Sequence, residues 1–365
     1  MEPDTQVWQG KPVFLLFFSL SLLFLLALSV VISLSLGSAN LSSAMVWRIV
    51  LSRLPLTEAW IGADWSASSE TIVLQVRLPR IALAILVGAS LGIAGVAFQA
   101  ILHNPLADPY ILGVSSGASM GVALVIVMGW QWFLGEWTIP VVAFLMGLAT
   151  LAAVYRLTRV GGHLDAQTLI LSGVVVQAFL SALLSFFLSI SEDRMQQIVY
   201  WLMGSLALKD WAAAGTVLPF LLTGGVVLFG TSKALNLLTL GDAQAAYLGV
   251  PVQQLRVLVM VAATLLTAAA VSVSGIIGFV GLVVAHVVRL IVGPDHRLLI
   301  PLAALGGAIF TIWADTAARM VLAPQELPIG VMTALLGAPF FAYLLRRDRK
   351  KRSAVCKTVP NRQKR

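Results

Sequence analysis

Ser232 to Arg256 reads SKALNLLTLGDAQAAYLGVPVQQLR, and this stretch interrupts a chain that is otherwise built from long apolar runs. Polar and apolar residues alternate in it, so it cannot cross a bilayer, whose hydrocarbon layer requires about 20 predominantly apolar residues. Asp242 can cap a helix, and Gly249 with Pro251 can end it, which predicts about two helical turns.

A helix this short is marginal in water, so we expect it to lean on another surface. Ala243, Ala245 and Ala246 would offer a small knob that suits a cleft in a partner protein. The alternative is an ordinary ordered loop between two membrane spans.

The composition indicates that lipid is the solvent for most of the chain. Hydrophobic residues make up 59% of it, charged residues 11%, and the mean hydropathy is +0.94, whereas a soluble domain carries about 25% charged residues. We predict an all-α polytopic membrane protein in which residues 1–345 form a single transmembrane domain. The ten candidate spans are 13–36, 81–102, 110–129, 138–155, 168–190, 212–231, 257–273, 276–292, 298–318 and 328–345.

Two of these spans have alternatives. The run 257–292 is interrupted only by SVSG (Ser272–Gly275), which we interpret as a tight hairpin; merging its halves would give nine spans. The run 13–36 could be a signal peptide, but the apolar part of a signal peptide is about 7–15 residues long, so a span is favoured.

Lys and Arg set the orientation, because cytoplasmic loops carry more of them. Placing the C-terminus inside puts most of the 24 basic residues in the cytoplasm, and ten spans then put both termini there. The segment Ser232–Arg256 lies on the same inner side. The outer basic residues are Arg48, Arg53, Arg77, Arg80, Arg194, Lys209 and Arg319.

The end of the chain, residues 346–365, is a strongly basic cytoplasmic tail. We expect it to attract anionic lipid headgroups rather than nucleic acid, because no folded domain accompanies the charge. Cys356, the only cysteine, lies in this tail, so an intrachain disulfide is excluded.

Small residues and one amphipathic segment suggest how the rest is arranged. Gly88 with Gly92, and Gly275 with Gly278 and Gly281, would let helices approach closely. In the first outer loop, 37–80, the segment LSSAMVWRIVLSRL predicts a short helix on the membrane surface.

The sequence contains few of the residue patterns that are typical of enzymes. No GxxxxGK[ST] phosphate-binding loop occurs, so we expect no ATP hydrolysis by this chain. The four histidines are scattered, and we expect no metal site and no cofactor. Asp315 is the one acidic residue inside a predicted span, and it can pair with Arg319 one turn later, which we favour over a proton site.

RLPR (Arg77–Arg80) stands where the first outer loop meets the second span, and Arg319 lies at the corresponding edge of the ninth span. These residues could snorkel to lipid headgroups. Alternatively they form a cationic rim for the carboxylates of an external partner.

Taken together, the chain resembles the permease subunits of ATP-binding-cassette importers for iron chelates, haem and cobalamin. The resemblance covers nearly everything from Arg77 to Arg346. It rests on RLPRIALAILVGASLGIAGVAFQ, NPLADPYILGVSSGA, LGDAQAAYLGVP, SGIIGFVGLVVAHVVRL, GPDHRLLIP, ADTAARM and ELPIGVMTALLGAPFFAYLL.

The resemblance implies two ten-span permease copies, or a copy and a paralogue, around a central path in the inner membrane. A dimer of ATPase subunits would sit inside, and a periplasmic or lipid-anchored substrate-binding protein would dock outside on Arg77, Arg80 and Arg319. The ATPase would receive a short coupling helix between the sixth and seventh spans. Its residues would be Leu240, Gly241, Asp242, Ala245, Leu248 and Gly249.

The resemblance also places residues along the path or at its cytoplasmic gate, namely Gln99, Asn104, Leu106, Asp165 and Ala166. The last two stand in HLDAQT (His163–Thr168), where the family usually has Ser or Thr, which puts a hydroxyl gate in doubt. Ala285 replaces a proline that is usual in the eighth span, so a kink there is in doubt as well.

The function implied is ATP-driven import of a metal chelate, with a ferric siderophore expected first, then haem or cobalamin. A secondary carrier driven by an ion gradient is the alternative, and Asp315 alone is thin support for one. An intramembrane enzyme would need paired carboxylates or a His/Asp cluster, and we see neither.

Overall fold

The computed structural model describes residues 12–37, 39, 41–53, 62, 64–159 and 164–358. Helices dominate the described chain, with one four-residue strand. The first part contains α1 (Pro12–Ser35), α2 (Ser43–Leu51), α3 (Ala67–Thr71), the π-helix η3 (Ile72–Arg77), α4 (Leu78–Ile101), α5 (Val114–Met128), β1 (Phe133–Glu136), α6 (Thr138–Thr158) and α7 (Ala166–Ser189).

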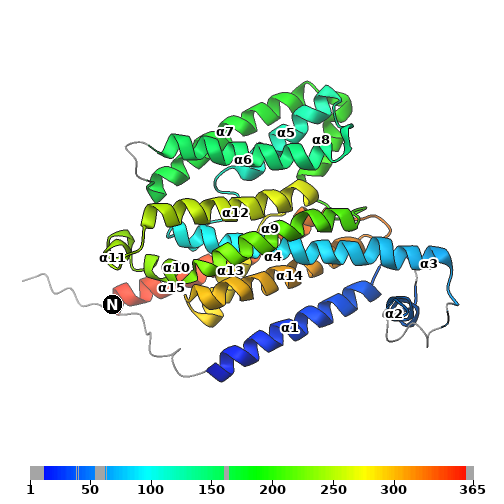
Figure 1. Cartoon of the computed structure of the whole chain (residues 1–365), viewed down its shortest axis with the longest axis horizontal. Helices are drawn as coiled ribbons and strands as arrows, with labels where there is room; N and C mark the ends of the chain where they lie inside the picture. The colour runs from blue at the N-terminus through cyan, green and yellow to red at the C-terminus, as the bar shows by residue number, and fades with distance from the viewer. Residues whose placement is uncertain are drawn as a thin grey trace, which may run out of the picture.

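The second part contains the 3₁₀ turn η4 (Glu192–Arg194), α8 (Met195–Leu202), α9 (Trp211–Gly230), α10 (Ser232–Leu238), α11 (Asp242–Tyr247), α12 (Val252–Ser274), α13 (Val280–Val292), α14 (His296–Met320) and α15 (Ile329–Thr358). α11 lies at one end of the molecule, and α2 with α3 lies at the other (Figure 1).

Seven helical runs in the described residues are long and apolar enough to cross a membrane. They coincide with seven of the predicted spans, at Phe14–Ser35, Ala67–Ile101, Gly135–Thr158, Ala166–Ser189, Trp211–Gly230, Val252–Ser274 and His296–Met320. The other three predicted spans coincide with shorter apolar helices, at Val114–Met128, Val280–Val292 and Ile329–Tyr343. α2 falls within the segment predicted as an amphipathic helix.

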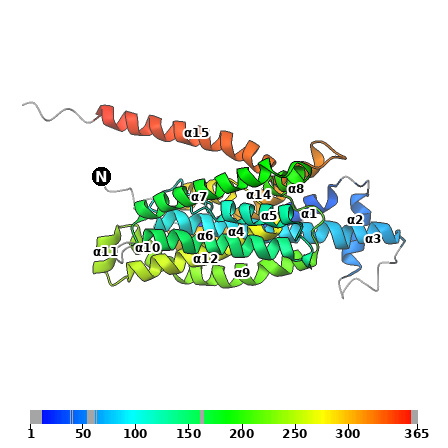
Figure 2. The same cartoon turned by 90° about the horizontal axis from the view of Figure 1, so that it is seen from above.

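α4 is the central helix, and nearly all its residues are buried. It packs against α9, α12, α13 and α14, while α5, α6 and α7 form a neighbouring group that α12 joins to the rest (Figure 1). α15 projects from the bundle (Figure 2) and continues as a helix to Thr358, beyond the predicted end of the span at 345.

Glycine allows α4 to pack so closely, as predicted for Gly88 and Gly92. A Cβ on Gly92 would lie 2.3 Å from the carbonyl oxygen of Ala303 in α14. A Cβ on Gly95 would lie 2.1 Å from that of Gly281 in α13. Any larger residue at these positions would have to push two helices apart.

The predicted hairpin at Ser272–Gly275 is wrong in its position. α12 continues through Ser274, and the break runs from Gly275, which has φ of +69°, to Phe279, with φ of +68°. α13 then packs on α4, α14 and α15, whereas α12 packs on α4, α6 and α9. Ala285 is buried in α13, which runs without interruption.

Candidate functional site

The polar stretch after α9 forms two short helices, α10 and α11, where the sequence predicted one. Gly241, with φ of +105°, precedes α11, and Gly249, with φ of +85°, follows it. Asp242 is the first residue of α11 and does not cap it, because its carboxylate accepts hydrogen bonds from Arg256 of α12, at 2.9 Å to each oxygen.

The prediction that Ala243, Ala245 and Ala246 together contact a partner is wrong for Ala245. Ala245 is 0% exposed and belongs to the chain's own hydrophobic core, so it cannot enter a partner's cleft. Ala243 and Ala246 remain exposed. The larger exposed groups around α11 are apolar: Leu240 is 54% exposed, Tyr247 91% and Leu248 58%.

Three predicted path residues lie at or just after the C-terminal end of α4. Gln99 is buried, and its Nε2 donates to the carbonyl oxygens of Ala107 and Leu282 at 3.4 Å each, so it holds α4, the following loop and α13 together. Asn104 Oδ1 accepts from the backbone N–H of Leu106 at 2.9 Å, which shapes a turn that leaves the Leu106 side chain exposed.

The other two predicted gate residues start α7. Asp165 is its N-cap and accepts from the N–H groups of Gln167 and Thr168 at 3.0 Å each. These hydrogen bonds, above all the one from Thr168, lower the pKa of the Asp165 carboxyl. Ala166 begins the helix and packs partly against the core. His163 lies outside the described residues.

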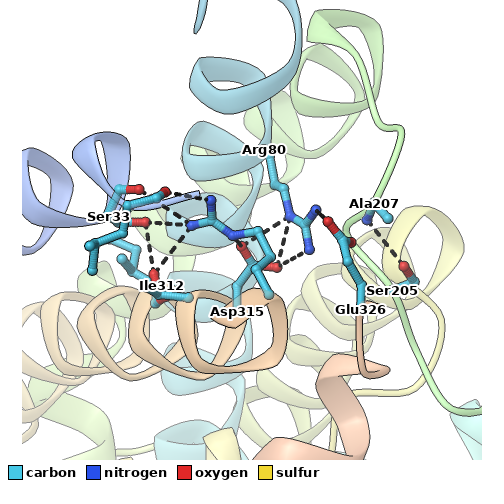
Figure 3. A network of polar contacts seen from close by, with 10 residues as sticks. Ser33, Arg80, Ser205, Ala207, Ile312, Asp315 and Glu326 are labelled. Atoms are coloured by element: carbon cyan, nitrogen blue, oxygen red, sulfur yellow. Dashed lines mark hydrogen bonds and ion pairs between the residues drawn. The ribbon is translucent and has the colours of Figure 1, made fainter. Parts of the chain in front are cut away.

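At the opposite end, a buried ionic network joins α4 to α14. Arg80 Nε donates to both carboxylate oxygens of Asp315, at 2.9 and 3.0 Å, and its Nη1 donates to Glu326 (Figure 3). Arg319 Nε lies 3.1 Å from Asp315, so the predicted i, i+4 pair is present. Two guanidinium groups thus share one buried carboxylate, and Glu326 supplies a second negative charge.

The expectation that these arginines present an exposed rim is wrong for this structure. Arg77, Arg80 and Arg319 are 4%, 6% and 4% exposed. Arg77 donates to the backbone oxygens of Leu34 and Ala39, at 2.9 Å each. The side chains of all three arginines therefore already bind groups within the chain.

Two features of the structure were not predicted from the sequence. Glu326, in the loop between α14 and α15, completes the charge balance, and only the fold brings it to Arg80, 246 residues away. An open apolar groove of about 590 Å³ lies between α8, the Gly275–Phe279 break and α15. Its lining includes Leu202, Met203, Ile276, Phe279, Val331 and Leu335. No motif signals a groove that three distant segments build.

Comparison with known proteins agrees with this architecture. Residues 25–347 match the FecCD transport family. An uncharacterised ABC transporter permease protein of Bacillus subtilis, YvrB, is 44% identical over 334 residues, which cover 89% of this chain and 92% of that protein. The hemin transport system permease protein HmuU of Yersinia pestis is 39% identical over 350 residues, covering 94% and 98%.

A solved structure of a metal-chelate type ABC transporter in an inward-facing conformation superposes with a TM-score of 0.77 at 34% identity, over 90% of this chain and 99% of that one. The match extends over most of the helices described above. The chain belongs to the FecCD transport family and is a permease subunit of an ATP-binding-cassette importer.

Proposed function

We propose that this permease crosses the cell's inner membrane ten times, with both termini in the cytoplasm, and imports a metal chelate. Residues 1–345 form the membrane domain and residues 346–365 a cytoplasmic tail on the lipid surface. α5 and α13 are short, but each follows a non-helical segment that is partly buried against the other helices. Irregular backbone is tolerated at membrane depth where it is buried in protein or lines a cavity. Tyr110 Oη donates to the carbonyl oxygen of Ile277 at 3.0 Å and so joins these two segments.

The coupling to ATP rests on the apolar surface of α11. Leu240, Tyr247 and Leu248 expose large side chains at the end opposite α2 and α3 (Figure 1). Such a patch on a polar end of a membrane protein fits a protein interface. We infer that a dimer of ATPase subunits receives α11 there, and that ATP-driven movement of α11 tilts the spans to expose the path to alternate sides.

The path itself needs a second permease copy or a paralogue. The groove beside α15 is open along its side, and its apolar lining offers few fixed polar contacts to a cargo. A second copy facing the first would close it into a central path. Selectivity would then come mainly from an external binding protein, periplasmic or lipid-anchored, that delivers the cargo.

When the binding protein docks, Arg80 at the outer end would exchange a carboxylate of this chain for one of the docking protein. Carboxylates of the docking protein would take the place of Glu326, whose side chain is 29% exposed, at Arg80. Arg77 and Arg319 lie beside this position and would add to its positive field. The carrier alternative loses its main support, since Asp315 is held between two guanidinium groups.

The cargo is a metal chelate by analogy with the relatives, one named for hemin and another for cobalamin. A ferric siderophore remains our first expectation, with haem or cobalamin next. Purification of the binding protein with its bound molecule, followed by mass spectrometry, identifies the cargo.

The α11 assignment is tested by Leu248→Ala and Tyr247→Ala. Each removes exposed apolar surface without touching the core, so each should weaken retention of the ATPase when the tagged permease is purified from membranes. Leu222→Ala in α9, where Leu222 is 57% exposed, is the size-matched control. Equal retention in all three variants would show that α11 is not the docking site.

A further inference from the structure

We propose that Arg256 is a positioning residue that transmits the movement of α11 to the inner end of α7. This inference rests on the proposed coupling of α11 to an ATPase. Arg256 stands near the start of α12 and is 1% exposed. One of its terminal nitrogens, Nη2, binds both carboxylate oxygens of Asp242, the first residue of α11.

The other terminal nitrogen of the same guanidinium reaches a different segment. Nη1 donates to the carbonyl oxygen of Leu164, which directly precedes Asp165, the N-cap of α7. A single planar group therefore connects α11, α12 and the entry to α7. Arginine suits this task because its donors diverge in a rigid fork, whereas a lysine ammonium is a compact point charge on a flexible stem.

Leu164 is fixed a second time from α12. Its backbone N–H donates to Gln253 Oε1 at 2.9 Å, and its side chain is 3% exposed. Both backbone polar groups of Leu164 are thus bound by side chains from the first two turns of α12. The start of α7 should move with the start of α12 as one unit.

α10 is attached to a different helix, α14, so movement of α10 and movement of α11 would reach different parts of the molecule. Asn236 Nδ2 donates to Asp295 Oδ1 at 2.6 Å, and the N–H of His296 donates to Asn236 Oδ1 at 2.8 Å, so α10 is tied to α14. α11, in contrast, packs on α10 and α12. Asp242 also lies 3.9 Å from His103 Nε2 in the loop after α4, but its hydrogen-bonded route to α7 is the Asp242–Arg256–Leu164 connection.

Arg256→Lys distinguishes transmission from simple bracing. Lysine keeps the charge that pairs with Asp242, but one ammonium cannot hold the carboxylate and the Leu164 oxygen in the same fixed geometry. In proteoliposomes with the ATPase and the loaded binding protein, we expect the complex to assemble and hydrolyse ATP. The amount of cargo imported per ATP should fall by about fivefold or more, the range typical of a coupling energy between sites.

The matched control is Arg297→Lys, an exposed arginine on the same side of the molecule, which should keep the wild-type ratio. An unchanged ratio in Arg256→Lys, in a complex that requires ATP, overturns the inference and leaves the proposed function intact. Wild-type import without the ATPase would instead overturn the proposed function.

A second measurement does not depend on assembly. Spin labels are placed at Gln167 of α7 and Gln254 of α12, both exposed, in the full-length permease carrying Cys356→Ser. We expect a narrow distance distribution in the wild-type background and a clearly broader one in Arg256→Lys and in Gln253→Ala. Distributions of equal width in all three would contradict the connection between α12 and α7.

Discussion

The backbone of Gly88 in α4 lies directly against the backbone of Gly307 in α14. A Cβ on Gly88 would lie 2.2 Å from the carbonyl oxygen of Gly307, and a Cβ on Gly307 would lie 2.1 Å from that of Gly88. Lipid supplies no hydrophobic drive for two helices to associate, so this close approach is a main source of the packing between them.

Gly88→Ala should therefore destabilise the permease by about 1–3 kcal/mol, the usual cost of overpacking a core. Gly215→Ala in α9 is the control, because a Cβ there meets nothing within 4 Å. Thermal unfolding in detergent measures both. Equal melting temperatures would mean that α4 and α14 are not in this contact.

Asp315→Asn removes the carboxylate that Arg80 and Arg319 share. Two buried guanidinium groups then lose their common partner, which should cost about 3–5 kcal/mol of unfolding free energy. Asp64→Asn is the control, because the pair of Asp64 with Arg48 is exposed and such pairs contribute about 0–1 kcal/mol. Similar losses in the two variants would argue against a buried network.

The cap of α7 should make stability depend on pH. Hydrogen bonds to Asp165 lower the pKa of its carboxyl below the ordinary value of 3.8. The contribution is present above that ordinary value and is lost as pH falls through the lowered pKa. Asp165→Asn should flatten this part of the curve in acid unfolding, and Asp165→Ala should cost about 1 kcal/mol at neutral pH. If the wild type and Asp165→Asn lost the same stability as the pH falls, the ionised Asp165 carboxylate would not be the cap of α7.

Two alanines of α11 should respond differently to enlargement. Ala245→Leu forces a larger side chain into the core and should lower the stability of the permease alone by about 1–3 kcal/mol. Ala246→Leu changes only an exposed position and should leave that stability unchanged while altering ATPase retention. Equal stability of the two variants would show that Ala245 is not buried as described.

The sequence predicted the helices well because apolar length and polar interruptions are local properties. Asp242 begins α11 and Gly249 follows it, as the helix-starting and helix-ending residue types predicted, although Asp242 is not the cap. The Asp315–Arg319 pair followed from its i, i+4 spacing. The predicted break after α12 begins three residues before the observed one. SVSG consists largely of turn-forming residues, but the hydroxyls of Ser272 and Ser274 donate to helix carbonyls, so the helix continues through them.

The site was harder to predict because it depends on which side chains point into the core and which point to the surface. Nothing in DAQAAY shows that Ala245 faces the core, since that direction is set by packing against distant helices. The burial of Arg80 depends on Glu326 arriving from another loop. The sequence shows Arg256 only as a basic residue at the end of a polar stretch, and its hydrogen bonds to Asp242 and Leu164 form only when α7, α11 and α12 meet.

We infer that the permease is driven by ATPase subunits that act on it through α11. Reconstitution into liposomes tests this inference, with cargo uptake measured with and without the ATPase subunits and the binding protein. We predict uptake against a gradient only when both partners and ATP are present, and its loss when the ATPase is omitted. Concentrative uptake by the permease alone, driven by a proton or sodium gradient, would show that the inference is wrong.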